Sequence, residues 1–324
     1  MIDAQDARDP TDALSPAAIR GARAGIAPAF LGTPQYVHEG LSARAGIPVI
    51  VKVEAVNPIR SFKGRGTWVA VHGLAEEGRV GPDRAVVVAS AGNFGQGVAY
   101  AARALGVPAV VFTSRHANRA KIARMRALGA SVIEAGEDFD DARTAAEVYA
   151  TANGAELLVD GDDPRIATGA ATMALEITDA VDAGALPAPA VALVPVGNGS
   201  LINGVGSWLR AAAPGCRVIG VQAEAAPAMT LSWRAGRPID TPSAATYADG
   251  IAARVAIPSA VELMAARVDE MVLVSDDALR VAQALLTDEL GVTVEGAAAA
   301  AWAGLEGIPR PDGPALLIIT GSNT

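Results

Sequence analysis

One lysine beside an aromatic residue is the first feature of the chain that could carry chemistry. Lys63 follows Phe62 in the segment NPIRSFKGRG (57–66), and the chain has only two other lysines, Lys52 and Lys121. An amine can form an imine with a carbonyl group and can remove a proton, whereas an arginine side chain stays protonated. Apolar surroundings make an amine give up its charge more readily. The segment therefore predicts a nucleophile and base, and the alternative is an ordinary solvated lysine.

Two glycine-rich loops follow predicted buried strands. In ASAGNFGQG (89–97), the glycines let the backbone approach a ligand, and Ser90 and Asn93 add short polar groups. In VPVGNGSLINGVG (194–206), the residues from Gly197 to Ser200 lead into a predicted helix, where successive amides form an anion site suited to a phosphate. Either loop taken alone could be an ordinary turn between a strand and a helix.

The combination of groups is more specific than any one of them. The chain has an amine, an asparagine-bearing loop, a phosphate-type loop and a hydroxyl after the last predicted strand, in ITGSNT (319–324). Pyridoxal phosphate needs these groups: an amine for its aldehyde, a donor for its 3-oxygen, a ring of amides for its phosphate and a partner for its ring nitrogen. The sequence therefore predicts pyridoxal 5'-phosphate as the cofactor.

Other cofactor and catalytic motifs are missing from the sequence. After Gly197 and Gly199, the third glycine of a dinucleotide-binding GxGxxG motif would fall on Ile202, and no Walker A or GxSxG motif occurs. The three histidines are scattered without the spacing of a zinc site, and the one cysteine, Cys216, lies in an apolar predicted strand. These patterns argue against hydride transfer, NTP hydrolysis and α/β-hydrolase chemistry, and the sequence predicts no metal ligands.

Six segments, in the right order and spacing over residues 30 to 324, resemble the fold type II pyridoxal phosphate enzymes of the tryptophan synthase beta-like superfamily. NPIRSFKGRG resembles their Ser-Phe-Lys motif, ASAGNFGQGVAYAARALGVPAVVF their Ser-x-Gly-Asn-His-x-Gln motif, and PVGNGSLI their phosphate loop. YADGIAARV, TVEGAAAAAWAGL and LLIITGSN resemble later blocks. Within this group the chain is similar above all to threonine/serine dehydratase (ammonia-lyase), and serine racemase is nearby.

The resemblance implies a role for each matching residue. Lys63 would bind the cofactor as an internal Schiff base and then remove the Cα proton of the substrate, and Phe62 would pack beside the cofactor. Asn93 matches the donor to the 3-oxygen, and Thr320 takes the place of the usual serine that faces the ring nitrogen. The phosphate would be held by Gly197, Asn198, Gly199, Ser200 and Leu201. The substrate would be held by Ser90, Ala91, Gly92, Asn93 and Phe94.

The chain departs from the family pattern at several of these positions. Phe94 stands where dehydratases commonly have histidine, so the loop keeps its backbone donors and could face a more apolar substrate. Ala91 replaces the second serine of serine racemase, which argues against racemisation. Thr320 keeps a neutral hydroxyl opposite the ring nitrogen, and the weaker electron sink favours β-elimination over transamination. Asn198 and Ser200 replace the usual glycines, but both can still donate to a phosphate.

The resemblance implies α,β-elimination on a threonine- or serine-like β-hydroxy L-amino acid, or on another β-substituted L-amino acid, to give a 2-oxo acid and ammonia. The β-group would leave with a proton from the cofactor phosphate. A second hypothesis is β-replacement or a threonine-synthase-like reaction, in which another nucleophile is added. A third is a cofactor-free binding or regulatory relative, against which the intact Lys63, Asn93 and phosphate loop argue.

Two acidic residues lie at further positions of interest in the resemblance. Glu224 lies where some relatives place a cation ligand, but Thr230 replaces their aspartate, so a monovalent cation is expected sooner than a divalent one. Glu295 matches a frequent acidic residue near the cofactor ring, and is explained equally well as a glutamate at a helix start. Arg60 and Arg65, which flank the lysine, are interpreted as domain-anchoring or surface charges.

Short apolar, β-branched runs alternate with helix-like stretches and would position these loops. The runs cover residues 47–54, 84–90, 108–114, 130–136, 155–161, 190–199, 216–224, 270–275 and 314–323. Continuous apolar runs fit strands covered on both faces, so the sequence predicts an α/β protein with mainly parallel sheets. With the resemblance, it implies two open, twisted sheets with flanking helices and the cofactor between a large and a small domain. Residues 85–159 would form the small mobile domain, and residues 1–84 and 160–324 the large PLP-binding domain.

Composition narrows the partners of the chain. Its 324 residues carry a net charge of −9 and no lysine- or arginine-rich run, which argues against binding of nucleic acid. No segment approaches ~18 consecutive apolar residues, and the amino terminus is too acidic and polar for a signal peptide. We therefore expect a cytoplasmic protein with no membrane partner, a small amino-acid substrate and, because two-fold dimers are the commonest assemblies, a homodimer.

Overall fold

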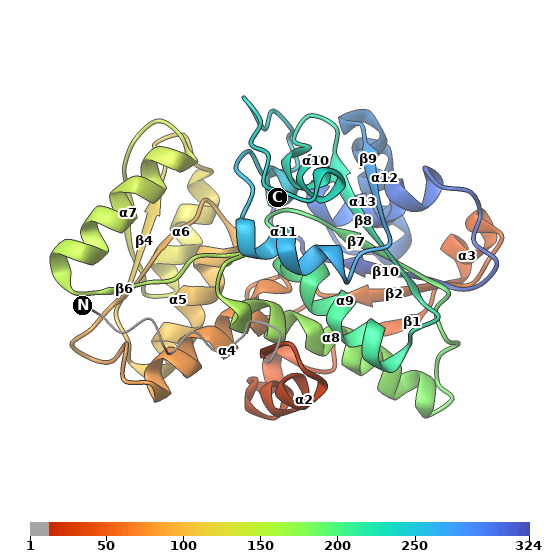
Figure 1. Cartoon of the computed structure of the whole chain (residues 1–324), viewed down its shortest axis with the longest axis horizontal. Helices are drawn as coiled ribbons and strands as arrows, with labels where there is room; N and C mark the ends of the chain where they lie inside the picture. Colours follow the sequence, from red (N-terminus) through yellow and green to blue (C-terminus); the bar gives the residue numbers. More distant parts are fainter. Residues whose placement is uncertain (1–12) are drawn as a thin grey trace.

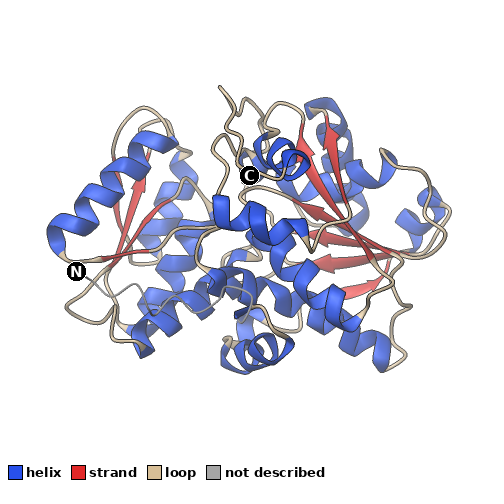
Figure 2. Ribbon diagram, in the orientation of Figure 1, coloured by secondary structure: helices blue, strands red, loops and turns tan. Residues whose placement is uncertain are grey.

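Two mainly parallel sheets with flanking helices make up the computed structural model of the chain, which describes residues 13–324 (Figure 1, Figure 2). The first twelve residues of the predicted large domain lie outside the described residues. The α/β fold class predicted from the sequence is confirmed. No helix in the described part of the chain combines the length and the apolar character needed to cross a membrane.

The larger sheet has six strands in the order β1-β2-β10-β7-β8-β9. β1 runs antiparallel to β2, and the other neighbouring pairs are parallel. The strands are β1 (Gln35–Val37), β2 (Val49–Val53), β7 (Val191–Pro195), β8 (Arg217–Ala223), β9 (Glu270–Val274) and β10 (Ala315–Ile319). The sequence did not predict β1, because a three-residue edge strand with exposed side chains leaves no apolar run.

The smaller sheet has four parallel strands in the order β5-β4-β3-β6. They are β3 (Val86–Ala89), β4 (Ala109–Thr113), β5 (Ser131–Glu134) and β6 (Glu156–Leu157). All four lie within residues 85–159, and each of the nine predicted apolar runs contains one of the strands from β2 to β10.

Helices connect the strands and flank both sheets (Figure 2). The α-helices are α2 (Pro16–Gly25), α3 (Glu39–Ala45), α4 (Lys63–Glu76), α5 (Asn93–Leu105), α6 (Arg119–Ala127), α7 (Phe139–Asn153), α8 (Pro164–Asp182), α9 (Ser200–Ala212), α10 (Ala228–Ala235), α11 (Pro258–Ala265), α12 (Asp276–Leu290) and α13 (Gly296–Glu306). Two 3₁₀ helices are η1 (Pro28–Phe30) and η2 (Asp249–Ile251). α4 packs against both α5 and α8, and so connects the two parts of the molecule.

Alternate residues of the central strands pack into different apolar layers. Along β10, Leu316 belongs to the layer that contains residues of α8 and α9, whereas Leu317 belongs to the layer that contains residues of α12 and α13. In the smaller sheet, Val88 packs with α5, and Val87 packs with α7. Both faces of these strands are covered, and this is why the strands appear in the sequence as continuous apolar runs.

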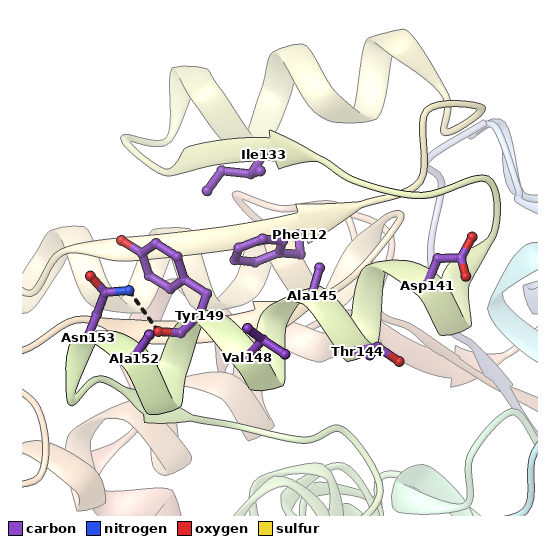
Figure 3. Close-up of a pocket in the computed structure, with 9 residues that line it drawn as sticks. All are labelled: Phe112, Ile133, Asp141, Thr144, Ala145, Val148, Tyr149, Ala152 and Asn153. Carbon is purple, nitrogen blue, oxygen red and sulfur yellow. Dashed lines mark hydrogen bonds between the residues drawn. The ribbon is translucent and has the colours of Figure 1, made fainter.

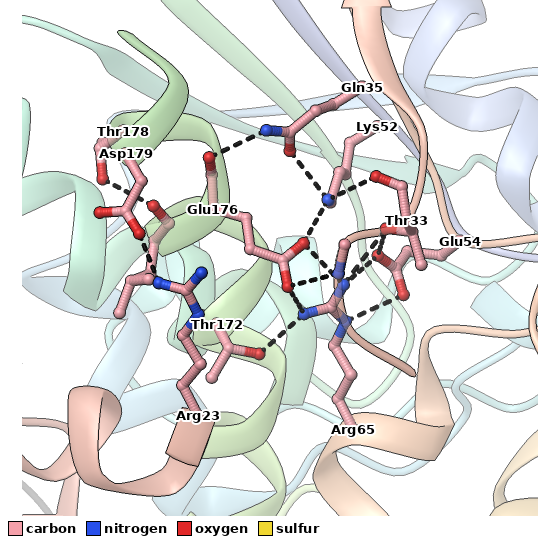
Figure 4. Close-up of polar contacts among 12 residues, drawn as sticks. Arg23, Thr33, Gln35, Lys52, Glu54, Arg65, Thr172, Glu176, Thr178 and Asp179 are labelled. Atoms are coloured by element: carbon pink, nitrogen blue, oxygen red, sulfur yellow. Dashed lines mark hydrogen bonds and ion pairs between the residues drawn. The ribbon is translucent and has the colours of Figure 1, made fainter. Parts of the chain in front are cut away.

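A buried group of charges joins β2, α4 and α8 (Figure 4). Arg65 of α4 is fully buried, and its guanidinium lies 2.9 Å from Glu54 Oε1 and 2.8 Å from Glu176 Oε1. Lys52 of β2 completes the group, with its Nζ 2.5 Å from Glu176 Oε2. Two cations therefore face two carboxylates inside the protein. The interpretation of Arg65 as a surface charge is wrong, because this side chain fixes α4 to the larger sheet.

Pairing outweighs the cost of burial for Glu176, but not for Lys52. Burial by itself would raise the pKa of Glu176, but hydrogen bonds and the charges of Arg65 and Lys52 lower it to about 2. Because this pKa lies below its ordinary value of 4.5, Glu176 stabilises the fold above that pH, and the contribution is lost as the pH falls towards 2. The pKa of Lys52 is lowered by burial, which Glu54 and Glu176 only partly offset.

Replacing the buried arginine should cost much more stability than replacing an exposed one. Arg65→Met would leave Glu54 and Glu176 short of a counter-ion, so we expect the free energy of unfolding to fall by about 3–5 kcal/mol in urea denaturation. Arg217→Met is the matched control, because Arg217 pairs with Glu270 on the surface, and its loss should stay below about 1 kcal/mol. Equal losses in the two variants would contradict this account of the charge group.

Candidate active site

Lys63 is the first residue of α4, and its amine contacts both aromatic and charged groups. Its Nζ lies 4.9 Å from the centroid of the Phe62 ring and 5.9 Å from that of Phe94. The same atom donates a hydrogen bond of 2.5 Å to Oδ2 of Asp160. The Lys63 side chain is mostly buried. The sequence predicted apolar surroundings for its amine, but the amine also contacts a carboxylate. Asp160 was not predicted from the sequence; the only signal was the acidic run VDGDDP (159–164) after a predicted strand.

Local hydrogen bonds hold the segment that leads into α4. Asn57 Oδ1 accepts hydrogen bonds from the amides of Ile59 and Ser61, and its Nδ2 donates to the Ser61 carbonyl. The Phe62 amide donates to the carbonyl of Thr320, which brings the lysine next to the end of β10. Lys63 and Thr320 are 257 residues apart in the sequence. These contacts explain how their two segments come together.

The first glycine-rich loop enters α5 at Asn93. Ser90 Oγ accepts hydrogen bonds from the amides of Gly92, at 3.2 Å, and Gly95, at 2.9 Å, so the serine hydroxyl shapes the loop itself. Phe94 is buried in the apolar layer of the smaller sheet, and Ala91 is partly exposed. The role of these residues in binding a substrate carboxylate stays a prediction.

Asn93 belongs to a polar group at the junction of α5, α13 and the chain end. Its Nδ2 donates to both carboxylate oxygens of Glu295, at 3.0 and 3.1 Å, and its Oδ1 accepts from Asn323 Nδ2 at 2.7 Å. Glu295 is fully buried, and burial, with a smaller effect of Asp249, raises its pKa to about 7 against the opposing hydrogen bond from Asn93. From the sequence, Glu295 could be an acidic residue near the cofactor ring or only a glutamate at a helix start. A helix-start glutamate needs no buried contact with Asn93, so this contact favours the first explanation.

Thr320 lies at the end of β10 with a buried hydroxyl. Among the described residues, its Oγ1 finds no hydrogen-bond partner, although buried hydroxyls normally have one. A pyridine nitrogen could accept a hydrogen bond from this hydroxyl. The neutral hydroxyl therefore fits the predicted cofactor ring.

The second glycine-rich loop leads from β7 into α9. Gly199 has a φ of 101°, and a Cβ on Gly197 would lie 2.6 Å from the carbonyl of Gly250, so both positions require glycine. Within the described chain, the amides of Gly197, Asn198 and Gly199 donate to no other protein group. Such amides at a helix start fit a phosphate. The Leu201 side chain packs in the core, which leaves only its backbone for a ligand.

Ser200 connects this loop to the lysine. Its Oγ donates to Oδ1 of Asp160 at 3.0 Å, while Oδ2 of the same carboxylate accepts from Lys63. The structure thus brings Lys63 and Phe62 together with Thr320, and links the lysine to the phosphate-type loop through one carboxylate. Asn93 lies with Glu295 and the chain end.

An open hollow elsewhere on the molecule contains none of the predicted site residues. It is lined by α7 together with Phe112 of β4 and Ile133 of β5 (Figure 3). Within residues 13–324, no group of three or more histidine, cysteine, aspartate or glutamate side chains has metal-binding geometry. Glu224 is exposed, and the hydroxyl of Thr230 donates to Gln222 Oε1.

Known proteins are similar to this chain over most of its length. Residues 26–321 match the model of the family described as pyridoxal-phosphate dependent enzyme. The chain is 39% identical to an L-threonine ammonia-lyase of Thermotoga maritima over 80% of its own length, and spans 63% of that relative. It is 35% identical to a phenylserine dehydratase of Ralstonia pickettii, over 90% of this chain and 86% of that one.

Solved structures of related proteins have the same fold. A threonine deaminase from T.th. superposes with a TM-score of 0.87 at 30% identity, over 96% of this chain and 98% of that one. A maize serine racemase superposes with a TM-score of 0.86 at 26% identity, over 94% of this chain and 92% of the other. The predicted resemblance to fold type II enzymes is confirmed.

The raised pKa of Glu295 should make stability depend on pH. Between its ordinary value of 4.5 and the folded value of about 7, the folded chain keeps a proton that the unfolded chain releases, so stability falls as the pH rises through this interval. Glu295→Gln removes this effect. Relative to the unmodified chain, the variant should gain about 2–3 kcal/mol between pH 5 and pH 8 in urea denaturation of the cofactor-free chain.

A surface glutamate provides the control for this experiment. Glu270→Gln changes an exposed pair with Arg217, and its stability relative to the unmodified chain should stay nearly constant with pH. If Glu295→Gln were also constant between pH 5 and pH 8, the carboxyl would not carry the proton assigned to it.

Proposed function

Because the chain belongs to the pyridoxal-phosphate dependent enzyme family, we propose that it is an ammonia-lyase that performs α,β-elimination on a β-hydroxy or other β-substituted L-amino acid. The observation that carries this proposal is the buried, neutral hydroxyl of Thr320 at the end of β10. A hydroxyl there leaves the ring nitrogen of the cofactor unprotonated, which favours elimination over transamination. The chain spans under two thirds of its Thermotoga relative, so activity is inferred from the site as well as from similarity.

Each site residue has a part in this proposal. The bound cofactor supplies an aldehyde and an electron sink for the pair left on Cα. Lys63 would hold the cofactor through its amine and, once released, would take the proton from Cα. Asn93 would donate to the 3-oxygen through the Nδ2 group that contacts Glu295 in this structure, and the backbone from Gly197 to Leu201 would hold the phosphate. Phe62 packs beside the ring, and the substrate carboxylate meets the loop from Ser90 to Phe94.

The smaller sheet is proposed to move as a unit over the site. Residues 85–159 would be the small mobile domain, and residues 1–84 and 160–324 the large one. Several contacts between the two units are polar pairs, which can break without exposing apolar surface, and residues of α4 also pack into the apolar layer of the smaller sheet. The polar pairs are Lys121–Asp249, Arg124–Asn323 and Arg254–Asp140.

Three further predictions concern the location of the protein, its assembly and a bound cation. We propose a cytoplasmic location and, because two-fold dimers are the commonest assemblies, a homodimer. A monovalent cation near Glu224 also stays a prediction. The exposed carboxylate supports it, and the Thr230 hydroxyl donates its hydrogen to Gln222, which leaves its oxygen lone pairs unused by that bond.

Phe94 favours a second candidate substrate class. Its ring lies 5.9 Å from Lys63 Nζ, in the place where dehydratases commonly have an imidazole, and a β-phenyl group could pack against it. The similarity to a phenylserine dehydratase agrees with this choice. The β-substituent of the preferred substrate would then be apolar.

The proposed activity can be tested directly on the purified chain. L-threonine, L-serine and phenylserine should each be tried, and at least one should yield a 2-oxo acid and ammonia. Lys63→Ala should lower kcat by on the order of 10³ or more, because nucleophile and base are lost together. After borohydride reduction, mass spectrometry should find a pyridoxyl group on the Lys63 peptide, with Lys52 and Lys121 as internal controls. Product formed only with an added thiol would favour β-replacement.

The substrate preference has its own test. Phe94→Ala should raise KM for phenylserine about tenfold, the equivalent of about 1.4 kcal/mol of aromatic contact, and change KM for L-threonine little. Phe112→Ala, which removes a buried aromatic away from Lys63, controls for a general loss of stability. An equal change for both substrates would exclude a specific contact with Phe94.

A further inference from the structure

The carboxylate of Asp160 is the one charged group that touches the reacting amine. Among the described residues, it is the only hydrogen-bond partner of Lys63 Nζ, with Oδ2 at 2.5 Å. The two side chains are only 13% and 15% exposed, so little water competes with the pair. None of the roles proposed above uses this carboxylate.

The loop between β6 and α8 is built so that Asp160 points into the site. Gly161, the next residue, has a φ of 97°, and a Cβ there would lie 3.1 Å from the Asn198 carbonyl. The loop therefore packs directly on the phosphate-type loop. A glycine is needed at this point because any side chain would push the two loops apart.

Each aspartate of this loop has a different partner. Asp163 accepts from the amide and guanidinium of Arg165 at the start of α8. Asp162 accepts from Ser259 Oγ at 2.8 Å. Asp160 alone contacts site residues. The loop therefore contains both a residue to test and a natural control of the same charge.

The contact with Ser200 fixes the orientation of the Asp160 carboxylate. Asp160 Oδ1 accepts a hydrogen bond from Ser200 Oγ, with 3.0 Å between the two oxygens. Oδ2 is then directed at Lys63. The bond to Oδ1 uses only the side chain of Ser200, so the amides of Gly197, Asn198 and Gly199 stay available for a phosphate, whereas the Ser200 amide donates to Asn198 Oδ1. Because both oxygens are held, the carboxylate need not reorient when charge appears on the amine.

We propose that Asp160 is a positioning residue that stabilises the positive charge on Lys63 as this amine takes the Cα proton. The inference rests on the proposed function. As the Cα–H bond breaks, its proton forms an N–H bond at Nζ, and the electron pair on Cα forms the Cα–Cβ double bond. The Cβ–O bond breaks with its electron pair going to oxygen, and the departing hydroxyl group would take a proton from the cofactor phosphate, so that it leaves as water. The amine changes from neutral to cationic in this step, and a fixed carboxylate favours that change.

Asp160→Asn keeps the shape of the side chain and removes its charge. The variant should lower kcat on the order of 10²-fold with little change in KM, because the contact matters most when the amine is charged. Asp160→Glu should recover part of the loss, and Asp162→Asn should behave like the unmodified chain. If Asp160→Asn fails to fold by circular dichroism, Asp160→Ser takes its place.

Two readouts separate a failure of this inference from a failure of the proposed activity. Exchange of the substrate Cα hydrogen with D₂O, followed by NMR, reports proton removal whether elimination or replacement follows, and it should slow in Asp160→Asn. Acetic anhydride labelling of the folded, cofactor-free chain should modify Lys63 several-fold faster in that variant than in Asp162→Asn.

The outcomes are distinct. Slower exchange with faster labelling supports the role of Asp160 even if no 2-oxo acid forms with any substrate, in which case only the lyase proposal fails. If exchange, labelling and kcat of Asp160→Asn equalled those of Asp162→Asn, the proposed role of Asp160 would be overturned. The proposed function would still hold if both variants formed the 2-oxo acid.

Discussion

The buried ion group around Arg65 is the constraint on which the site depends. Successive residues of an α-helix turn by about 100°, so side chains two positions apart leave in roughly opposite directions. Arg65 is held inside the protein by Glu54 and Glu176, and Lys63 at the start of the same helix therefore faces the other way. The carboxylates need their counter-ion at a fixed place, because an unpaired buried charge is costly. This need fixes the orientation of α4, and with it the direction of the amine.

The charges near the amine are few and each is held by hydrogen bonds. Asp160 contacts Lys63 and Ser200, and Glu295 contacts Asn93 and the amide of Asn323. The first carboxylate is adjacent to an amine, whereas the second is buried among neutral amides, and burial raises its pKa to about 7. The end of β10 offers only a neutral hydroxyl. One carboxylate thus contacts the amine, and the other lies against Gly321, next to the residue assigned to the ring nitrogen.

Elements from both sheets supply the site. α5 and its loop come from the smaller sheet, whereas α9, β10 and the chain end come from the larger one, and α4 packs against helices of both (Figure 1). The two units are joined by charged side chains of α6 and α7 and also by an apolar layer that residues of α4 share with α5.

The sequence by itself determined the fold class, nine of the ten strands, and the lysine and glycine loops at the ends of strands. These features depend on neighbouring residues: apolar runs mark covered strands, glycine permits tight turns, and a lysine offers amine chemistry wherever it lies. Tertiary structure alone decided which charges meet. Lys63 and Asp160 are 97 residues apart, Arg65 and Glu176 111, and Asn93 and Glu295 202. No local pattern records such pairs, because a charge finds its partner only when distant segments have packed and water has been excluded between them.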